Sequence, residues 1–276
     1  MAGFFGLFNY AKEGPGIEKD APKKKTFVVF FETFFRNFWK FIPISFVYCL
    51  ISLPVLTSGL AAAGLTNVTR NIARDKHSFG LSDFFDTIKS NWKQALPAGI
   101  INLAIYAVLA IDMWVFFSWF KGMVSAVLLG VGISIIYIFT VMTYYIWTLI
   151  ITFNFKLSEV YKNSFKFVFI NFKMNLLCFL MITAIYALFL VVGYFVGNSM
   201  AVTVIEFALF VFCFPAFRYL IIQYCIFPSV KKYIIDPYYK EHPYEDIEKR
   251  RNLGIETELP EEDGEENEDS AEENAE

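Results

Sequence analysis

Cysteine and histidine are scarce in this 276-residue chain, which contains four cysteines and two histidines. The four cysteines lie in apolar stretches without CxxC spacing, at Cys49, Cys178, Cys213 and Cys225. This pattern is typical of small packing side chains rather than of disulfides or a metal site. Two histidines, His77 and His242, are too few for a histidine-based metal centre. We therefore expect no bound metal.

Motifs for catalysis and nucleotide binding are also missing. The sequence has no P-loop, no GxGxxG after a strand, no HExxH and no GxSxG nucleophile elbow. Basic residues alternate with aromatic residues in parts of the chain, but membrane binding explains that pattern better than binding of nucleic acid. We expect no enzymatic activity, no cofactor and no nucleic acid partner.

Basic residues are absent from residues 256–276, which hold twelve acidic side chains. The rest of the chain carries 24 basic and 15 acidic residues, a net charge of +9. A solvated acidic run of this kind is typical of a disordered end, with partner binding by that end as the alternative. We predict a cytoplasmic arm at 1–25, a helical membrane domain at 26–235 and a disordered acidic tail at 236–276.

Apolar residues dominate the chain. Hydrophobic residues make up 56% of it and include 33 phenylalanines and 15 tyrosines, too apolar a composition for an ordinary soluble domain. Four stretches exceed the ~20 residues that cross a ~30 Å hydrocarbon core: 95–120, 122–155, 174–196 and 199–228. The sequence predicts an all-α, polytopic transmembrane helical bundle with the lipid bilayer as its main partner.

Three amphipathic helices are predicted at the membrane surface, over 26–40, 81–94 and 157–173. Each ends in an aromatic residue beside a lysine: Trp39-Lys40, Trp92-Lys93 and Phe172-Lys173. Such a pair anchors a helix because the ring lies at headgroup level while the ammonium reaches water. Since lysine favours the cytoplasmic side, all three ends are predicted to lie there.

The apolar stretch 41–67 is interrupted by Pro54 and Gly59. If it crosses once, the basic residues of the loops divide 8 against 15 between the two sides. If it enters and returns, 22 lie on one side and only Lys121 on the other, as the positive-inside rule prefers. We predict a short hairpin before the four full spans, about six membrane segments, with both termini in the cytoplasm. The small residues from Gly59 to Gly64 could pack tightly as the second, returning arm of this hairpin. Two full crossings and a re-entrant hairpin both remain open.

Three charged residues lie within the predicted spans and are candidate binding residues: Asp112, Glu206 and Arg218. Asp112 and Glu206 are predicted at a similar depth, roughly 10–12 Å below the outer surface. There they could share a proton or bind a cation or polar solute, and hydrogen bonding inside the bundle is the alternative. Arg218 follows Pro215, which frees a backbone carbonyl. Structural pairing and ligand binding are both open for it.

Small residues recur every four positions in one predicted span: Gly122, Ala126, Gly130 and Ser134. They predict a ridge along one helix face that permits close helix approach. Packing of this small-residue ridge within the chain is expected, and homodimerisation is the alternative.

Several motifs resemble those of the YesL-like family, small bacterial membrane proteins with a domain of unknown function. They are Phe8-Asn9-Tyr10, residues 13–16, 22–25, 34–40 and 53–59 as far as Gly64, and Asn91-Trp92-Lys93. The resemblance covers roughly residues 5–235. It implies a multi-pass protein of the bacterial plasma membrane with no established catalytic residues, from a family often encoded beside carbohydrate ABC importers. The expected function is a non-enzymatic accessory associated with permease components of such an importer. The alternative is a small solute or ion transporter or channel with a path near Asp112 and Glu206.

Overall fold

The computed structural model describes residues 26–76, 78–196 and 200–241. Every regular element in these residues is helical, which confirms the all-α prediction. The predicted arm 1–25 and most of the predicted tail lie outside the described residues. The elements are α1 Thr26–Arg36, α2 Phe38–Ser52, the short helix η1 Val55–Thr57, α3 Ser58–Ala73, α4 Leu81–Ser118, α5 Gly122–Thr152, α6 Leu157–Ile170, α7 Phe172–Val196, α8 Met200–Phe212, α9 Phe214–Val230, the π-helix η2 Lys231–Ile235 and α10 Asp236–Glu241.

Three of these helices, α4, α5 and α7, are long and apolar enough to cross a membrane. The pair α8–α9 passes the same test together, although it is bent by 46°. These four candidates correspond to the four predicted full spans, and they identify the chain as an integral membrane protein. Helix α2 is apolar but has only 15 residues, about 22 Å at 1.5 Å per residue.

The predicted surface helix 81–94 and the predicted span 95–120 form one continuous helix, α4. The helix continues through Pro97 and Gly99 without a break. The other two predicted surface helices end earlier than expected. Trp39-Lys40 lies at the start of α2, and Phe172-Lys173 at the start of α7. Residues 236–241, assigned to the tail from sequence, form α10.

The predicted span 199–228 is broken at Cys213, between α8 and α9. Pro215 causes the break, because proline lacks the amide hydrogen that would bond to the carbonyl four residues earlier. That carbonyl belongs to Val211, and it accepts a hydrogen bond from the Cys49 thiol of α2, with Sγ 3.6 Å from the oxygen. The freed backbone group is therefore satisfied by a neighbouring helix, not by Arg218.

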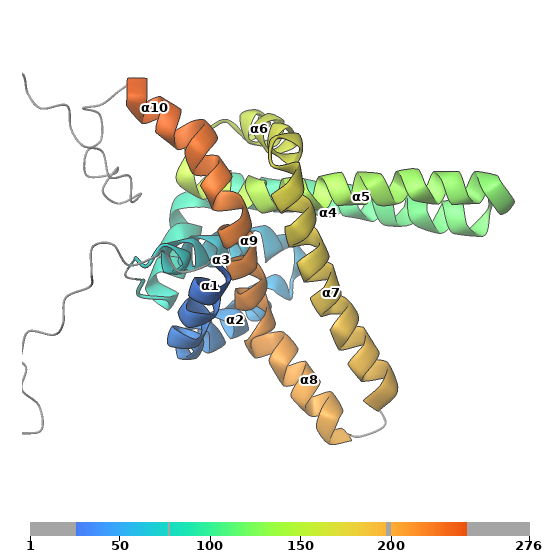
Figure 1. Ribbon diagram of the computed structural model, residues 1–276, viewed down its shortest axis with the longest axis horizontal. Coiled ribbons are helices and arrows are strands. Elements are labelled where there is room, and N and C mark those ends of the chain that lie inside the picture. Colours follow the sequence, from blue (N-terminus) through green and yellow to red (C-terminus); the bar gives the residue numbers. More distant parts are fainter. Residues whose placement is uncertain (1–25, 77, 197–199, 242–276) are drawn as a thin grey trace, which may run out of the picture.

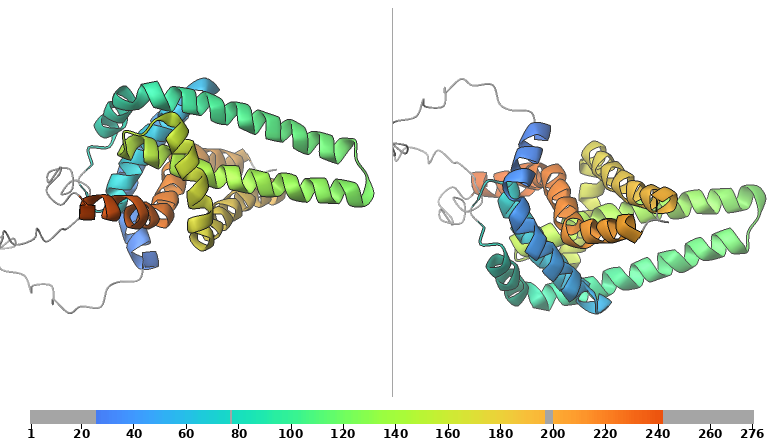
Figure 2. Two further views of the ribbon diagram at one scale, coloured as in Figure 1. Left: turned by 90° about the horizontal axis from the view of Figure 1, so that it is seen from above. Right: turned by 90° about the horizontal axis from the view of Figure 1, so that it is seen from below.

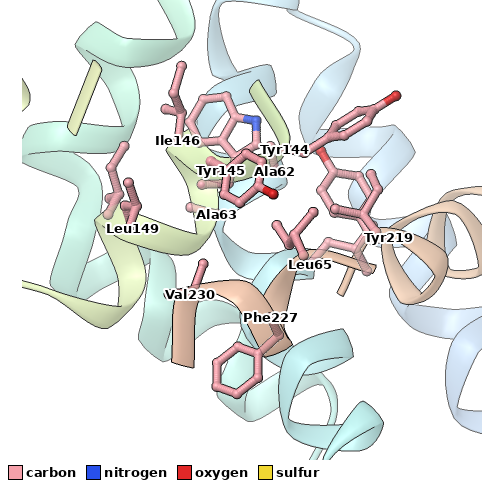
Figure 3. Close-up of a cluster of buried hydrophobic side chains, with 14 of the residues drawn as sticks. Ala62, Ala63, Leu65, Tyr144, Tyr145, Ile146, Leu149, Tyr219, Phe227 and Val230 are labelled. Carbon is pink, nitrogen blue, oxygen red and sulfur yellow. The ribbon is translucent and has the colours of Figure 1, made fainter. Parts of the chain in front are cut away.

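Helix α3 lies at the centre of the molecule and packs against α2, α4, α5 and α9. The side chains of α3, α5 and α9 meet in the buried core (Figure 3), where Ala63, Leu65, Leu149 and Val230 are almost fully buried. Two helical hairpins, α4–α5 and α7–α8, leave this core in different directions (Figure 1). Figure 2 shows α4 and α5 running side by side far beyond the core.

The predicted N-terminal hairpin consists of α2, a connection containing Pro54 and η1, and α3. Gly59 and Gly64 lie inside α3 rather than at the break. A Cβ atom added to Gly59 would lie 2.5 Å from the backbone oxygen of Ala95 and 2.7 Å from Cα of Gly99. One added to Gly64 would lie 2.9 Å from the ring of Phe84. Both glycines are thus needed for the close approach of α3 to α4.

We predict that Gly59→Ala destabilises the protein by about 1–3 kcal/mol, as expected for overpacking against backbone atoms that cannot move aside. The matched control is Gly130→Ala, since no atom lies within 4 Å of a Cβ added there. Thermal unfolding of the purified chain in detergent, followed by tryptophan fluorescence, measures both. Equal melting temperatures for the two variants would contradict the close approach.

Candidate functional site

Buried polar side chains join α3 to α4 and α5. Arg70 of α3 is only 8% exposed. Its terminal nitrogens donate hydrogen bonds to Thr152 Oγ1, at 2.5 Å, and to Asn67 Oδ1, at 2.7 Å. The Asn67 amide in turn donates to Thr87 Oγ1 at 2.7 Å. The guanidinium is thus held by neutral oxygen atoms of α3 and α5, and Asn67 links it to α4.

The same polar layer reaches α9 through Thr148, one turn before Thr152 on α5. The side-chain amide of Gln223 donates to Thr148 Oγ1 at 3.0 Å. Two buried atoms of this layer, Arg70 Nε and Gln223 Oε1, have no hydrogen-bond partner among the described residues. No carboxylate in the described part of the chain is ion-paired with Arg70. The layer therefore keeps a net positive charge.

Arg218 lies in a second cluster, the arginine–tyrosine cluster, which also contains Tyr48, Tyr144, Tyr186 and Tyr219. The guanidinium carbon is 5.4 Å from the ring centroid of Tyr219, and the arginine interacts electrostatically with all four phenols. The tyrosines come from α2, α5, α7 and α9, and Figure 3 shows two of them, from α5 and α9. In this cluster, a positive charge can interact with the faces of aromatic rings and with phenol oxygens.

The Arg218 Nε atom is buried and has no hydrogen-bond partner among the described residues. Sequence analysis identified the arginine because a charge within an apolar span is conspicuous. It missed the tyrosines, since an aromatic residue in a membrane helix is unremarkable and these four lie on separate helices. The buried polar layer was missed for a similar reason, because threonine, asparagine and glutamine occur throughout the chain.

Asp112 and Glu206 lie in different hairpins. Asp112 is half-buried on α4, and Glu206 is half-buried on α8. The Glu206 carboxylate packs beside Gly193 of α7 and lines a pocket of about 220 Å³ that is otherwise formed by apolar side chains of α7 and α8. Asp112 does not line this pocket. The structure therefore does not bring the two acids into one site.

The six anchor residues are all exposed, as lipid or headgroup contact requires: Trp39, Lys40, Trp92, Lys93, Phe172 and Lys173. Each pair lies in the first half of its helix, at the starts of α2 and α7 and before the apolar part of α4. The aromatic rings are at least half exposed, from 50% for Trp92 and Phe172 to 81% for Trp39. They are free to contact lipid in all three places.

The small-residue ridge of α5 faces away from the other helices that the structure describes. All four of its residues are exposed. Contact with α4 is made instead by Gly132, where an added Cβ atom would lie 2.6 Å from the sulfur of Met113. The expected packing of the ridge within the chain is wrong. Position 132 turns toward α4 because it lies about 200° around the helix from Gly130, at 100° per residue.

Comparison with known proteins gives one match. The sequence profile of a family described as "Protein of unknown function, DUF624" matches residues 41–113. No curated protein and no solved structure matches the chain. The matched segment contains most of α2, all of α3 and most of α4. It thus includes the hairpin, Arg70 and its partner Asn67.

We predict that Asn67→Leu destabilises the protein by about 1–3 kcal/mol, because it leaves a buried guanidinium nitrogen and Thr87 Oγ1 without their shared partner. Asn67→Asp keeps the oxygen that accepts from Arg70 and makes it part of a carboxylate. It replaces the amide nitrogen with an oxygen to which the Thr87 hydroxyl can turn from the Asp83 carbonyl, so we expect this variant to be at least as stable as the wild type. Thermal unfolding in detergent distinguishes them. Asn163→Leu on α6 is the control, and a loss as large there would show that leucine itself is harmful.

Proposed function

We propose that the protein is a non-enzymatic membrane accessory that packs its α4–α5 hairpin against a helix of another membrane protein. The observation that carries this proposal is the exposed small-residue ridge of α5. The partner class comes from the resemblance described above: the permease components of a carbohydrate ABC importer in the bacterial plasma membrane. The basic residues of the predicted cytoplasmic side support that orientation.

The ridge supports a protein partner better than a purely lipid contact. Between membrane helices, small residues allow backbones to approach closely, which brings more atoms into contact. Gly122 and Gly130 have no atom within 4 Å of an added Cβ, so no helix of the described residues packs closely on them. The Ser134 hydroxyl donates to the Gly130 carbonyl at 2.9 Å, so the ridge offers no unsatisfied hydroxyl proton to lipid.

The course of the hairpin also supports this function. In the most apolar 18-residue windows of α4 and α5, only 11% and 17% of the residues are buried. Helix α8 packs on α2, α7 and α9, and the α4–α5 hairpin leaves the core in another direction (Figure 1). The outer half of α5 therefore presents its ridge to whatever lies beside it in the membrane.

A non-enzymatic role is consistent with the chemistry of the buried clusters. The polar layer and the arginine–tyrosine cluster consist of arginine, amide, hydroxyl and phenol groups. Neither contains a carboxylate or an imidazole that could serve as a general base near neutral pH. The described residues also contain no group of three or more His, Cys, Asp or Glu side chains able to hold a metal ion.

The alternative, transport of a small solute or ion, has one supporting observation. Glu206 places a carboxylate in the apolar pocket between α7 and α8. A path that also uses Asp112 would have to link two hairpins, which makes this function the weaker proposal. Uptake measured in cells with Glu206→Gln tests it, and an unchanged rate would reject a path through this residue.

Co-purification from native membranes tests the accessory function. We expect importer permease components to be enriched with the tagged wild-type chain. Gly130→Phe is expected to reduce that enrichment about fivefold or more, because a ring on the ridge prevents close approach. Val124→Phe is the matched control, since Val124 is 57% exposed on another face of α5. Equal recovery with both variants, or no permease with the wild type, would contradict the proposal.

A further inference from the structure

Helix α3 ends in a tight turn that carries an unusual residue. The amides of Asp75 and Lys76 donate to the carbonyls of Ile72, at 3.1 Å, and Asn71, at 3.0 Å, which is the hydrogen-bond pattern of a Schellman motif. Asp75 has φ +52°, a conformation that glycine or asparagine normally adopts at this position. An aspartate there places a negative charge at the negative end of the helix dipole. The ion pair between Asp75 and Arg36 offsets that cost.

Three cations gather at the same end of α3: Arg70, Arg74 and Lys76. The Arg74 guanidinium lies 4.4 Å from the ring centroid of Phe227 in α9, and burial lowers its pKa to about 10. Burial, followed by the charges of Arg74 and Arg70, lowers the pKa of Lys76 to about 8. No carboxylate of the described residues is ion-paired with either arginine. Arg70 and Arg74 therefore place positive charge at this end of the helix that no carboxylate of the described residues pairs with.

A pocket of about 400 Å³ opens beside this turn, and its lining joins the end of α1 to the end of α3. It is formed by Arg36, Asn37, Ile72, Asp75 and Lys76. The volume exceeds that of a phosphate group, which is comparable to a few water molecules at about 30 Å³ each. Two of its five lining side chains are cationic, and the third charged one is the carboxylate already paired with Arg36.

We propose that this pocket binds a phosphate group, with Lys76 and Arg36 as the contacting residues. Arg70 and Arg74 do not line the pocket, but their charges act on Lys76 and raise the positive potential there. Their charge outweighs the partial negative charge of the helix end, which is roughly half a unit. In the absence of the ligand, Asp75 forms an ion pair with Arg36, so its carboxylate competes with phosphate for that arginine. Binding requires the phosphate to share or replace the Asp75 contact.

Two sources of phosphate fit this chemistry: the headgroup of an anionic lipid and a soluble phosphorylated compound. The pocket includes Asn37, which comes two residues before the anchor Trp39-Lys40 that is predicted to lie at headgroup level. An arginine is suited to either source, because its guanidinium donates two parallel hydrogen bonds to phosphate oxygens. The proposal is independent of the accessory function, since it concerns a different face of the molecule from the α5 ridge.

The test uses the full chain in nanodiscs of phosphatidylcholine. One arm replaces part of the lipid with phosphatidylglycerol, and the other adds inorganic pyrophosphate. The melting temperature and, for the lipid arm, the number of phosphatidylglycerol molecules retained in native mass spectrometry are measured. An effect confined to the first arm identifies a lipid headgroup, and an effect in the second identifies a soluble phosphate compound. No effect in either arm would overturn the proposal.

Variants decide whether the effect belongs to this pocket. We expect Lys76→Gln to weaken binding about tenfold, the loss typical of a hydrogen bond to a charged group. Asp75→Asn removes the competing anion while tolerating the positive φ, so we expect it to strengthen binding above that of the wild type. Lys162→Gln on the exposed face of α6 is the control for general loss of charge. If Lys76→Gln does not fold, weaker or unchanged binding in Asp75→Asn rejects the proposal by itself.

Discussion

The close approach of α3 to α4 is the constraint on which the rest of the structure depends. Gly59 and Gly99 meet with their backbones almost in contact, and Ala61, Ala62 and Ala63 are buried next to them. Bulky residues on α3 would hold the surrounding helices apart. Because its side chains are small, α3 can be surrounded by α2, α4, α5 and α9 at once. The short hairpin thus acts as the core of the molecule rather than as an appendage to the four longer spans.

The two buried arginines are accommodated in different ways. Arg70 donates to neutral oxygens of threonine and asparagine, and Arg218 lies among phenol rings. A buried charge is costly unless polar groups or an opposite charge surround it. Neither arginine has a carboxylate partner among the described residues. Both arginines therefore keep their positive charge within the packed core of the domain.

The contrast between the core and the two projecting hairpins matters for function. In the core, helix contacts are satisfied within the chain, down to the Val211 carbonyl that receives the Cys49 thiol. Along the outer half of α5, Gly122 and Gly130 of the small-residue ridge have no packing partner among the described residues. A membrane helix that presents a small-residue ridge on its outer face is suited to packing against another helix. This is the physical basis for proposing an accessory role.

Much of the architecture follows from sequence alone, because crossing a hydrocarbon core requires long apolar helices. The three long spans, the interruption around Pro54 and the exposed anchor residues all follow from composition and spacing. The bend at Cys213 follows from Pro215, which frees a backbone carbonyl, although the apolar run was counted as one span. Tertiary structure alone decided which residues meet. Four tyrosines from four helices surround Arg218, while Asp112 and Glu206, matched in depth by counting residues, lie in separate hairpins. Counting residues along an apolar run estimates the depth of a residue in the membrane. The direction in which each helix leaves the core depends on packing: α4 and α5 pack on α3, whereas α7 and α8 pack on α9 and α8 also on α2, which separates the two hairpins.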